Sequence, residues 1–179
     1  MGRPDDLQAR AGRSAEPTVS VHDERADPMA DTECYHDLAV AALLSQGVAG
    51  PCELSVTFVD PDEMAELNRR HMHAEGPTDV LSFPIDGDAT IGPGAHGGTD
   101  DPPPLLLGDV VICPAVAATN APDHAGSYDD EIALLIVHGI LHLLGHDHAD
   151  PDESAVMQAR ERELLDRFHG PLAGDPWGS

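Results

Sequence analysis

The sequence contains no lysine, and all nine of its basic residues are arginines. They are outnumbered by 33 aspartates and glutamates, so the formal net charge is -24 at pH 7. A chain with this charge repels polyanions at long range, which excludes a protein that coats nucleic acid through a broad basic surface. Any role on nucleic acid must therefore depend on a few arginines or on a bound metal ion.

Cysteine and aromatic residues are also scarce. The three cysteines, Cys34, Cys52 and Cys113, are odd in number and lack C-x-x-C spacing, so they predict neither a disulfide framework nor a thiolate zinc site. Aromatic residues make up 3% of the chain and apolar residues 41%, so aliphatic side chains must fill the core. The length of 179 residues favours a single domain.

No apolar run is suited to crossing a membrane. The most apolar stretch, residues 132–144, is too short and carries two histidines. Residues 1–17 lack the apolar segment of a signal peptide, and we interpret them as a disordered extension. We therefore expect a cytoplasmic protein without membrane contact.

Hydrophobic periodicity predicts strands interleaved with helices. The expected strands cover residues 18–21, 53–59, 78–84 and 105–113, and the expected helices cover residues 31–46, 61–70, 114–120, 129–144 and a last segment from about 151. Asp60 and Asp150 each precede a proline and stand three residues before a glutamate, which is typical of a helix start. This order predicts an α/β fold with a small mixed sheet of about four strands packed by helices.

The domain is expected to span residues 18–169, and three segments of the chain are expected to lack regular secondary structure. They are the N-terminal extension already described, residues 86–104 and residues 170–179. Glycine and proline cluster in residues 86–104 without periodicity, so we expect a long flexible loop there. The tail from 170 to 179 is expected to fray.

Three histidines, His138, His142 and His148, follow one another at spacings suited to a metal ion. Residues four apart lie on one face of a helix, so the first two can offer their imidazoles to the same ion. Gly145 permits a turn that returns His148 to them. Three neutral nitrogens with an open position are typical of a catalytic zinc site, where bound water is acidified to a pKa of about 7. The pattern predicts a hydrolytic site with one Zn²⁺, with His146 supporting it or facing solvent.

Two other enzyme classes match parts of this sequence. Residues 92–97 fit the G-x-G-x-x-G pattern, but they lie in the proline-rich segment and no helix is expected to start there, so dinucleotide binding is not predicted. The histidine spacing also fits metzincin proteases. Those enzymes need a glutamate after the first histidine, whereas this chain has Gly139, which disfavours peptide hydrolysis.

Three segments together resemble the YbeY family of bacterial endoribonucleases. The segment HGILHLLGHDH (138–148) is similar to that family's H-G-x-L-H-L-x-G-Y-D-H signature. Residues 77–84, PTDVLSFP, and residues 107–112, LGDVVI, resemble its P-T-D-V-L-S-F-P and L-G-D-I-V-I signatures. The resemblance covers roughly residues 18–169.

This resemblance implies a zinc-dependent enzyme that cuts single-stranded RNA, in maturation of the 3′ end of 16S ribosomal RNA and in ribosome quality control. The family's metal ligands fall on the three histidines named above. Asp79, Ser82 and Asp109 are implied as walls of the site, although capping or backbone bonding would equally explain Asp79 and Ser82. The implied partners are ribosomal RNA and the small ribosomal subunit or its proteins.

The chain departs from the family pattern at two positions. Met72 stands where many members have an arginine thought to contact RNA, and Arg69 and Arg70 lie about a helix turn away. His146 replaces the tyrosine of the histidine signature, which adds a titratable group. The metal ligands themselves are intact.

The hydrolytic hypothesis leaves the proton acceptor open. No glutamate adjoins the ligands, so Asp79 or Asp109 would have to assist a metal-activated water. One alternative is a metal-stabilised ribosome-assembly factor without catalysis, and a less favoured one is a metalloprotease. Because of the charge, we expect weak and salt-dependent affinity for free RNA.

Overall fold

The computed structural model describes residues 16–48, 50–86 and 104–178. Within these ranges it confirms the predicted α/β fold. The strands are β1 (Thr18–Asp23), β2 (Cys52–Phe58), β3 (Val80–Pro84) and β4 (Leu105–Ile112). The helices are α1 (Glu33–Ser45), α2 (Pro61–His71), α3 (Pro114–Asn120), the short 3-10 helix η2 (Ala121–Asp123), α4 (Tyr128–Leu143) and α5 (Pro151–Phe168).

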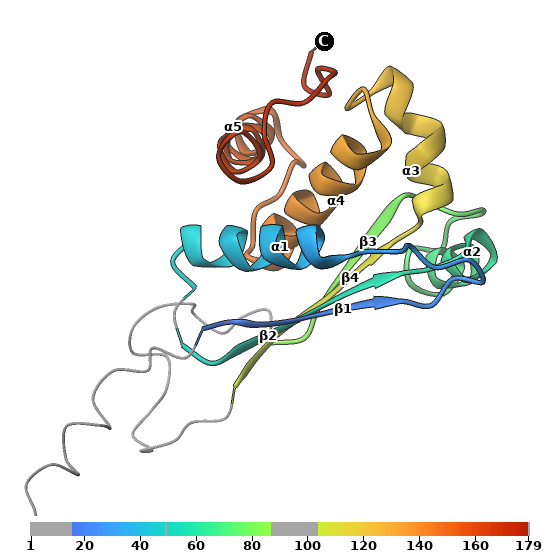
Figure 1. The fold of residues 1–179 in the computed structure, drawn as a ribbon, viewed down its shortest axis with the longest axis horizontal. Coiled ribbons are helices and arrows are strands. Elements are labelled where there is room, and N and C mark those ends of the chain that lie inside the picture. The colour runs from blue at the N-terminus through green and yellow to red at the C-terminus, as the bar shows by residue number, and fades with distance from the viewer. Residues whose placement is uncertain (1–15, 49, 87–103, 179) are drawn as a thin grey trace, which may run out of the picture.

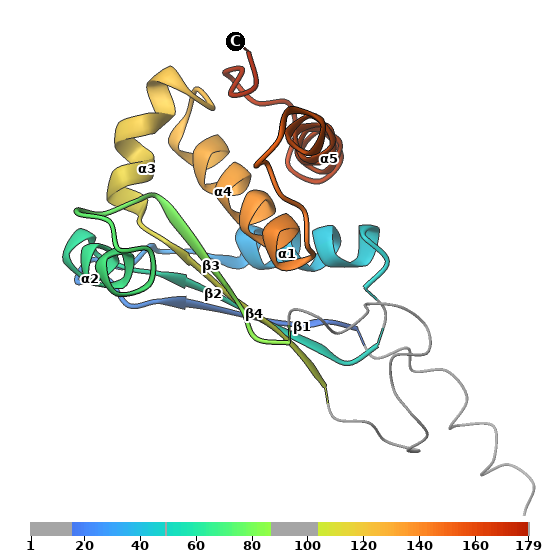
Figure 2. The same ribbon diagram turned by 180° about the vertical axis from the view of Figure 1, so that it is seen from behind.

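The four strands form one open, mixed sheet in the order β1-β2-β4-β3. Strands β1, β2 and β4 are parallel, and β3 runs antiparallel to β4 at the edge. Helices α1 and α4 lie together on one face of the sheet, with α5 beyond them (Figures 1 and 2). Parallel neighbours require crossover connections, and the helical connections along the chain supply them.

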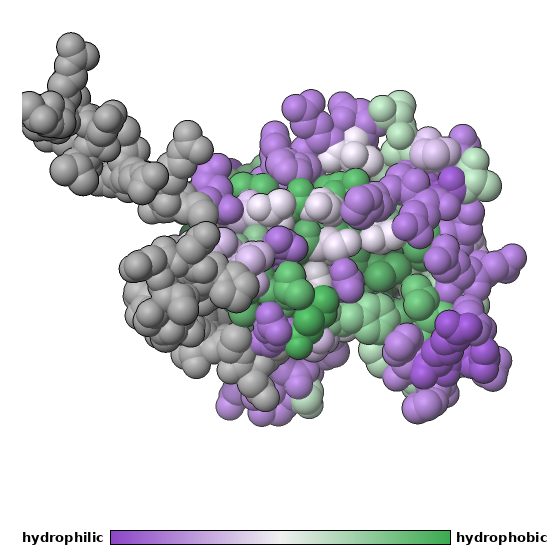
Figure 3. Space-filling view, turned by 90° about the horizontal axis from the view of Figure 1, so that it is seen from below, coloured by the Kyte–Doolittle hydropathy of each residue, from purple (hydrophilic) through white to green (hydrophobic). Residues whose placement is uncertain are grey.

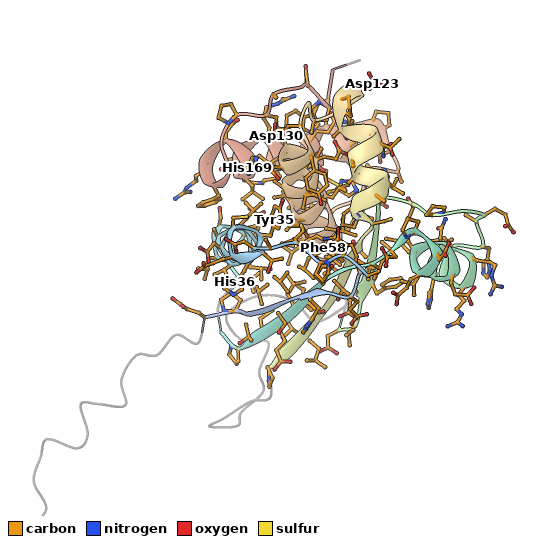
Figure 4. All side chains as sticks on the ribbon, turned by 45° about the vertical axis from the view of Figure 1, so that its right-hand side comes forward. Tyr35, His36, Phe58, Asp123, Asp130 and His169 are labelled. Carbon is orange, nitrogen blue, oxygen red and sulfur yellow. The ribbon has the colours of Figure 1, made fainter. Side chains whose placement is uncertain are left out.

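The main core lies between the sheet and helices α1, α4 and α5. Tyr35 of α1 and Phe58 of β2 meet in this layer with ring centroids 5.9 Å apart (Figure 4). Most of the other side chains in the core are aliphatic, as the scarcity of aromatic residues predicts. A smaller cluster, which includes Met64, Leu81 and Val111, lies on the other side of the sheet near α2. Figure 3 shows that polar and apolar residues are mixed on that side.

Helix α4 lies very close to the sheet at Gly139. A Cβ added there would stand 2.5 Å from Cγ1 of Val110 and 3.2 Å from Oγ of Ser82. The Ser82 hydroxyl donates a hydrogen bond of 3.3 Å to the carbonyl of Gly139. Glycine at this position therefore sets the distance between α4 and β4, and with it the position of the neighbouring His138.

We expect Gly139→Ala to destabilise the protein by about 1–2 kcal/mol. Alanine favours a helix, but the fully buried Val110 has no room to move away from the added methyl group. In a Val110→Ala background, which removes the two contacting methyl groups, the same change is expected to become neutral or stabilising. Thermal unfolding of the single and double variants measures this coupling, and equal effects in both backgrounds would contradict it.

The two predicted helix starts differ in their capping. The Asp150 carboxylate accepts bonds of 2.9 Å from the backbone N–H groups of Asp152 and Glu153, as the sequence predicts for α5. Asp60 occupies the corresponding position before α2, but its side chain makes no capping bond. It accepts a 2.9 Å bond from the N–H of Ala26 instead, because the segment after β1 passes beside it.

The C-terminal tail differs from the frayed segment expected for residues 170–179. Residues 170–178 follow α5 and pack back onto the helices, and Leu172 and Trp177 contact the main core. Backbone N–H groups of Ala173 and Gly174 bond to Asp130 and to the carbonyl of Ala125. These partners are tertiary and leave no local pattern in the sequence. The expected disorder of 1–17 and 86–104 concerns mainly residues 1–15 and 87–103, outside the described residues.

Candidate metal centre

The three predicted histidines are brought together beside β3. Their ligating nitrogens all lie within 4.8 Å of one another. The Nε2 atoms of His138 and His142 are 3.1 Å apart, and the ring of His148 has its centroid 5.6 Å and 5.0 Å from theirs. His138 and His142 are partly buried, and His148 is exposed. The three rings therefore leave one side open to solvent.

The end of α4 explains how His148 reaches the other two. Gly145 adopts φ +89°, a left-handed conformation that favours glycine. Its N–H bonds to the carbonyl of His142, and the N–H of His146 bonds to the carbonyl of Leu141, each at 3.0 Å. This pair of bonds is a Schellman motif, which ends the helix and reverses the chain.

The spacing of the first two histidines is close to that of two ligands on one tetrahedral zinc ion. Two nitrogens bound to one Zn²⁺ at about 2.0–2.1 Å lie about 3.3 Å apart, close to the separation of the Nε2 atoms of His138 and His142. Burial lowers the pKa of His142, and its neighbours His138 and His148 lower it further. The ring is therefore held in the neutral form that binds metals.

Glu161 of α5 orients the first histidine. Its Oε1 lies 2.7 Å from Nδ1 of His138, and its side chain is buried. A carboxylate on the far nitrogen of a ligating histidine fixes the ring and its tautomer, so that Nε2 faces the metal position. The sequence alone did not identify this residue. The available signal was its place on the apolar stripe of the last helix, four residues after Met157 and three before Leu164.

Asp79 and Ser82, which the family resemblance implies as walls of the site, lie next to the histidines. Both line a cavity of about 450 Å³ that also exposes His138, His142 and His148. The Asp79 carboxylate accepts bonds from the N–H of Val80 (2.9 Å) and, more weakly, from Asn120 Nδ2 (3.4 Å). Ser82 uses its hydroxyl to bind the helix backbone at Gly139, which is the structural role considered for it above.

Asp109 does not join this group. Its neighbours Gly108 and Val110 face α4, and side chains alternate along a strand, so Asp109 projects from the opposite face of the sheet. In the sheet it is paired with Phe83, which packs in the smaller cluster on that side. It lines none of the cavities around the histidines. The expectation that it forms a wall of the site is therefore not met.

The histidines open into a groove made of three adjoining cavities, all of which Asp79 lines. Beside the 450 Å³ cavity, a second of about 340 Å³ extends towards Trp177, and a third of about 490 Å³ extends along α3 and η2. His124 borders the last two, and its Nδ1 lies 2.9 Å from both oxygens of the fully buried Glu131. This pair was not predicted from the sequence either.

Comparison with known proteins identifies the family. The sequence model described as "Endoribonuclease YbeY" matches residues 20–169. An endoribonuclease YbeY from Salinispora tropica is 50% identical over 75% of this chain and 86% of its own length. Its counterpart from Thermobifida fusca is 49% identical over 83% and 92%. This chain belongs to the YbeY family.

A solved structure agrees on the fold. The solution structure of TM1509 from Thermotoga maritima matches with a TM-score of 0.54 at 20% identity, covering 90% of this chain and all of that one. At this identity the likeness concerns the fold alone. No helix in the described part of the chain is long and apolar enough to cross a membrane.

The structure shows where the two residues that depart from the family pattern, Met72 and His146, lie. Met72 is exposed at the rim of the 450 Å³ cavity, so the side chain at this position does face the groove. Arg69 and Arg70 line none of the three cavities, and both pair with Glu66 on the exposed side of α2. None of the residues that line the three cavities, all within the described ranges, is an arginine. His146 lies in the turn after α4, outside the group of converging nitrogens.

Proposed function

We propose that this YbeY-family protein is an endoribonuclease that cuts single-stranded RNA with one Zn²⁺ bound by His138, His142 and His148. Its proposed task is maturation of the 3′ end of 16S ribosomal RNA and ribosome quality control in the cytoplasm. The observation that carries the proposal is that one nitrogen from each of three imidazoles lies within 4.8 Å of the other two, in a groove open to solvent. When bound, zinc would acidify a water molecule and stabilise charge on the phosphoryl oxygens.

The residues of the chain would divide the remaining tasks. Glu161 holds His138 by its Nδ1 and so keeps Nε2 directed at the metal position. Asp79 lines the same cavity and has a partly exposed carboxylate, so it is the proposed acceptor of the proton from the attacking water. The groove would hold an extended RNA strand on both sides of the scissile phosphate.

A peptidase is disfavoured by packing as well as by sequence. The position after the first histidine would have to carry a glutamate as general base. Gly139 occupies it, and even a Cβ there would lie 2.5 Å from Val110. There is no space at this position for a carboxylate side chain.

The charges of the chain support delivery of the RNA by a ribosomal partner. Phosphate contacts from arginine and lysine supply most of the affinity of a protein for nucleic acid. This chain has a net charge of -24, and no arginine lines its groove in the described residues. We therefore propose that the small ribosomal subunit or its proteins present the RNA.

Metal analysis combined with RNA cleavage tests the proposal. We expect about one zinc per chain in the purified protein, loss of cleavage of a single-stranded RNA after chelation, and recovery on adding Zn²⁺. Circular dichroism of the chelated protein should stay native, because a catalytic ion leaves a folded apo form. A chelated protein that still cuts RNA would contradict the proposal. A chelated protein that unfolds would favour the metal-stabilised assembly factor instead.

A further inference from the structure

The C-terminal tail is attached to the metal centre by a series of hydrogen bonds. Residues 170–178 lie beyond the segment that the YbeY family model matches, which ends at residue 169. Asp130, near the start of α4, bonds to His169 (2.7 Å) and to the N–H of Ala173 (3.1 Å), and Asp130 and His169 lie close together in Figure 4. The N–H of Gly174 adds a 2.7 Å bond to the carbonyl of Ala125. These contacts return the tail towards α4.

Trp177 ends this path beside the metal ligands. Its indole Nε1–H donates a 2.7 Å hydrogen bond to Oε2 of Glu161. The guanidinium of Arg162 lies over its ring, 4.5 Å from the centroid. Trp177 and Pro176 also line the 340 Å³ cavity that exposes His138 and His148.

Glu161 therefore divides its two oxygens between the ligand and the tail. Oε1 contacts His138 and Oε2 contacts Trp177, each at 2.7 Å, and the residue is only 5% exposed. A buried carboxylate is stable and well oriented only when hydrogen bonds replace its lost hydration. Without the indole donor, Glu161 would keep one strong partner and could rotate away from His138.

We infer that the C-terminal tail is a strap that positions His138 for the metal through Trp177 and Glu161. Trp177 is thus a positioning residue and makes no contact with the ion. The inference rests on the proposed zinc site, because it concerns how firmly that site is held. Replacing a side chain that hydrogen-bonds to a metal-ligating histidine typically lowers metal affinity 10–100-fold. Trp177 bonds to Glu161 and not to His138 itself, so the effect of replacing it is expected at the lower end of that range.

The test measures zinc affinity directly. In competition with a chromophoric chelator, Trp177→Phe is expected to bind Zn²⁺ about tenfold more weakly than the wild type. Phenylalanine keeps an aromatic ring but lacks the N–H donor. Arg162→Gln is the matched control, because it removes the cation over the ring and leaves the hydrogen bond, so its zinc affinity should stay near that of the wild type.

A double-mutant cycle and a second variant separate positioning from general damage. In a Glu161→Gln background, Trp177→Phe should have much less effect than in the wild type, because the carboxylate it acts through is gone. Gly174→Ala should loosen the strap without altering either partner, since a Cβ there would lie 2.3 Å from the carbonyl oxygen of His124. It is also expected to weaken zinc binding. Trp177 is the only tryptophan of the chain, so its fluorescence can be followed without interference. A red-shifted emission in Gly174→Ala would show that the indole has left Glu161 and become exposed to water.

The outcomes distinguish the strap from the zinc site itself. If the wild type binds zinc and both Trp177→Phe and Gly174→Ala bind it equally tightly, the strap is refuted and the proposed function stands. If the wild type binds no zinc, the proposed function is refuted, and the strap inference that rests on it is refuted with it. A Trp177→Phe effect that persists unchanged in the Glu161→Gln background would also overturn the inference.

Discussion

Replacing His142 by alanine is expected to lower the rate of single-stranded RNA cleavage by about a thousandfold. The variant keeps only His138 and His148, and two imidazoles hold zinc far more weakly than three. His142 is the central ligand, since its Nε2 lies 3.1 Å from that of His138 and its ring is 5.0 Å from that of His148. The measurement is cleavage by highly purified wild type and variant, with zinc content determined on the same samples.

The control for this comparison is His36→Ala. His36 lies on α1 and pairs only with the exposed Asp37, away from the groove (Figure 4). Its replacement should leave both cleavage and zinc content unchanged. If His142→Ala and the wild type cut RNA at equal rates, the activity comes from a contaminant or from another site, and the zinc hypothesis is wrong.

Asp79→Asn is expected to reduce the same rate by about a hundredfold or more, with zinc content unchanged. Asparagine retains an oxygen that can accept the N–H of Val80, so the local backbone should hold, but it cannot accept the proton of the attacking water. The expected loss lies in kcat rather than KM, since the carboxylate acts on the water and not on RNA binding.

Asp109→Asn is the matched comparison, because the sequence alone proposed both aspartates. Asp109 faces away from α4 and from the histidines, so its variant should retain near wild-type cleavage. Equal losses in the two variants would mean that fold stability, not proton transfer, explains them. Thermal unfolding of both proteins provides that check.

The sequence predicted what depends on short-range periodicity. Alternation along the strands and capping patterns located the sheet and helices, and the four-residue spacing of His138 and His142 predicted their convergence. Gly145 predicted the turn that returns His148. Each of these signals acts within a few residues of the chain, where backbone geometry is nearly fixed by residue type.

Residues that act across the fold escaped prediction for a physical reason. Glu161 is 23 residues from His138, and Trp177 is 16 residues from Glu161. Their contacts exist only because α5 packs on α4 and the tail returns over both, and no spacing rule encodes that. Asp109 shows a second limit, which concerns the direction of a side chain within a correctly predicted strand. Its strand was located correctly, but a period of two does not reveal which face of the sheet a side chain takes.

The three proposed ligands lie within residues 138–148, whereas the groups that orient them come from α5 and the tail. Closing so short a loop around an ion costs little chain entropy, so even an unfolded chain can gather these histidines. Binding to the unfolded chain subtracts from the stabilisation that a ligand gives to the native state. Zinc should therefore raise the melting temperature by less than its affinity for the folded protein implies, and a newly made chain could acquire its ion before the sheet is assembled.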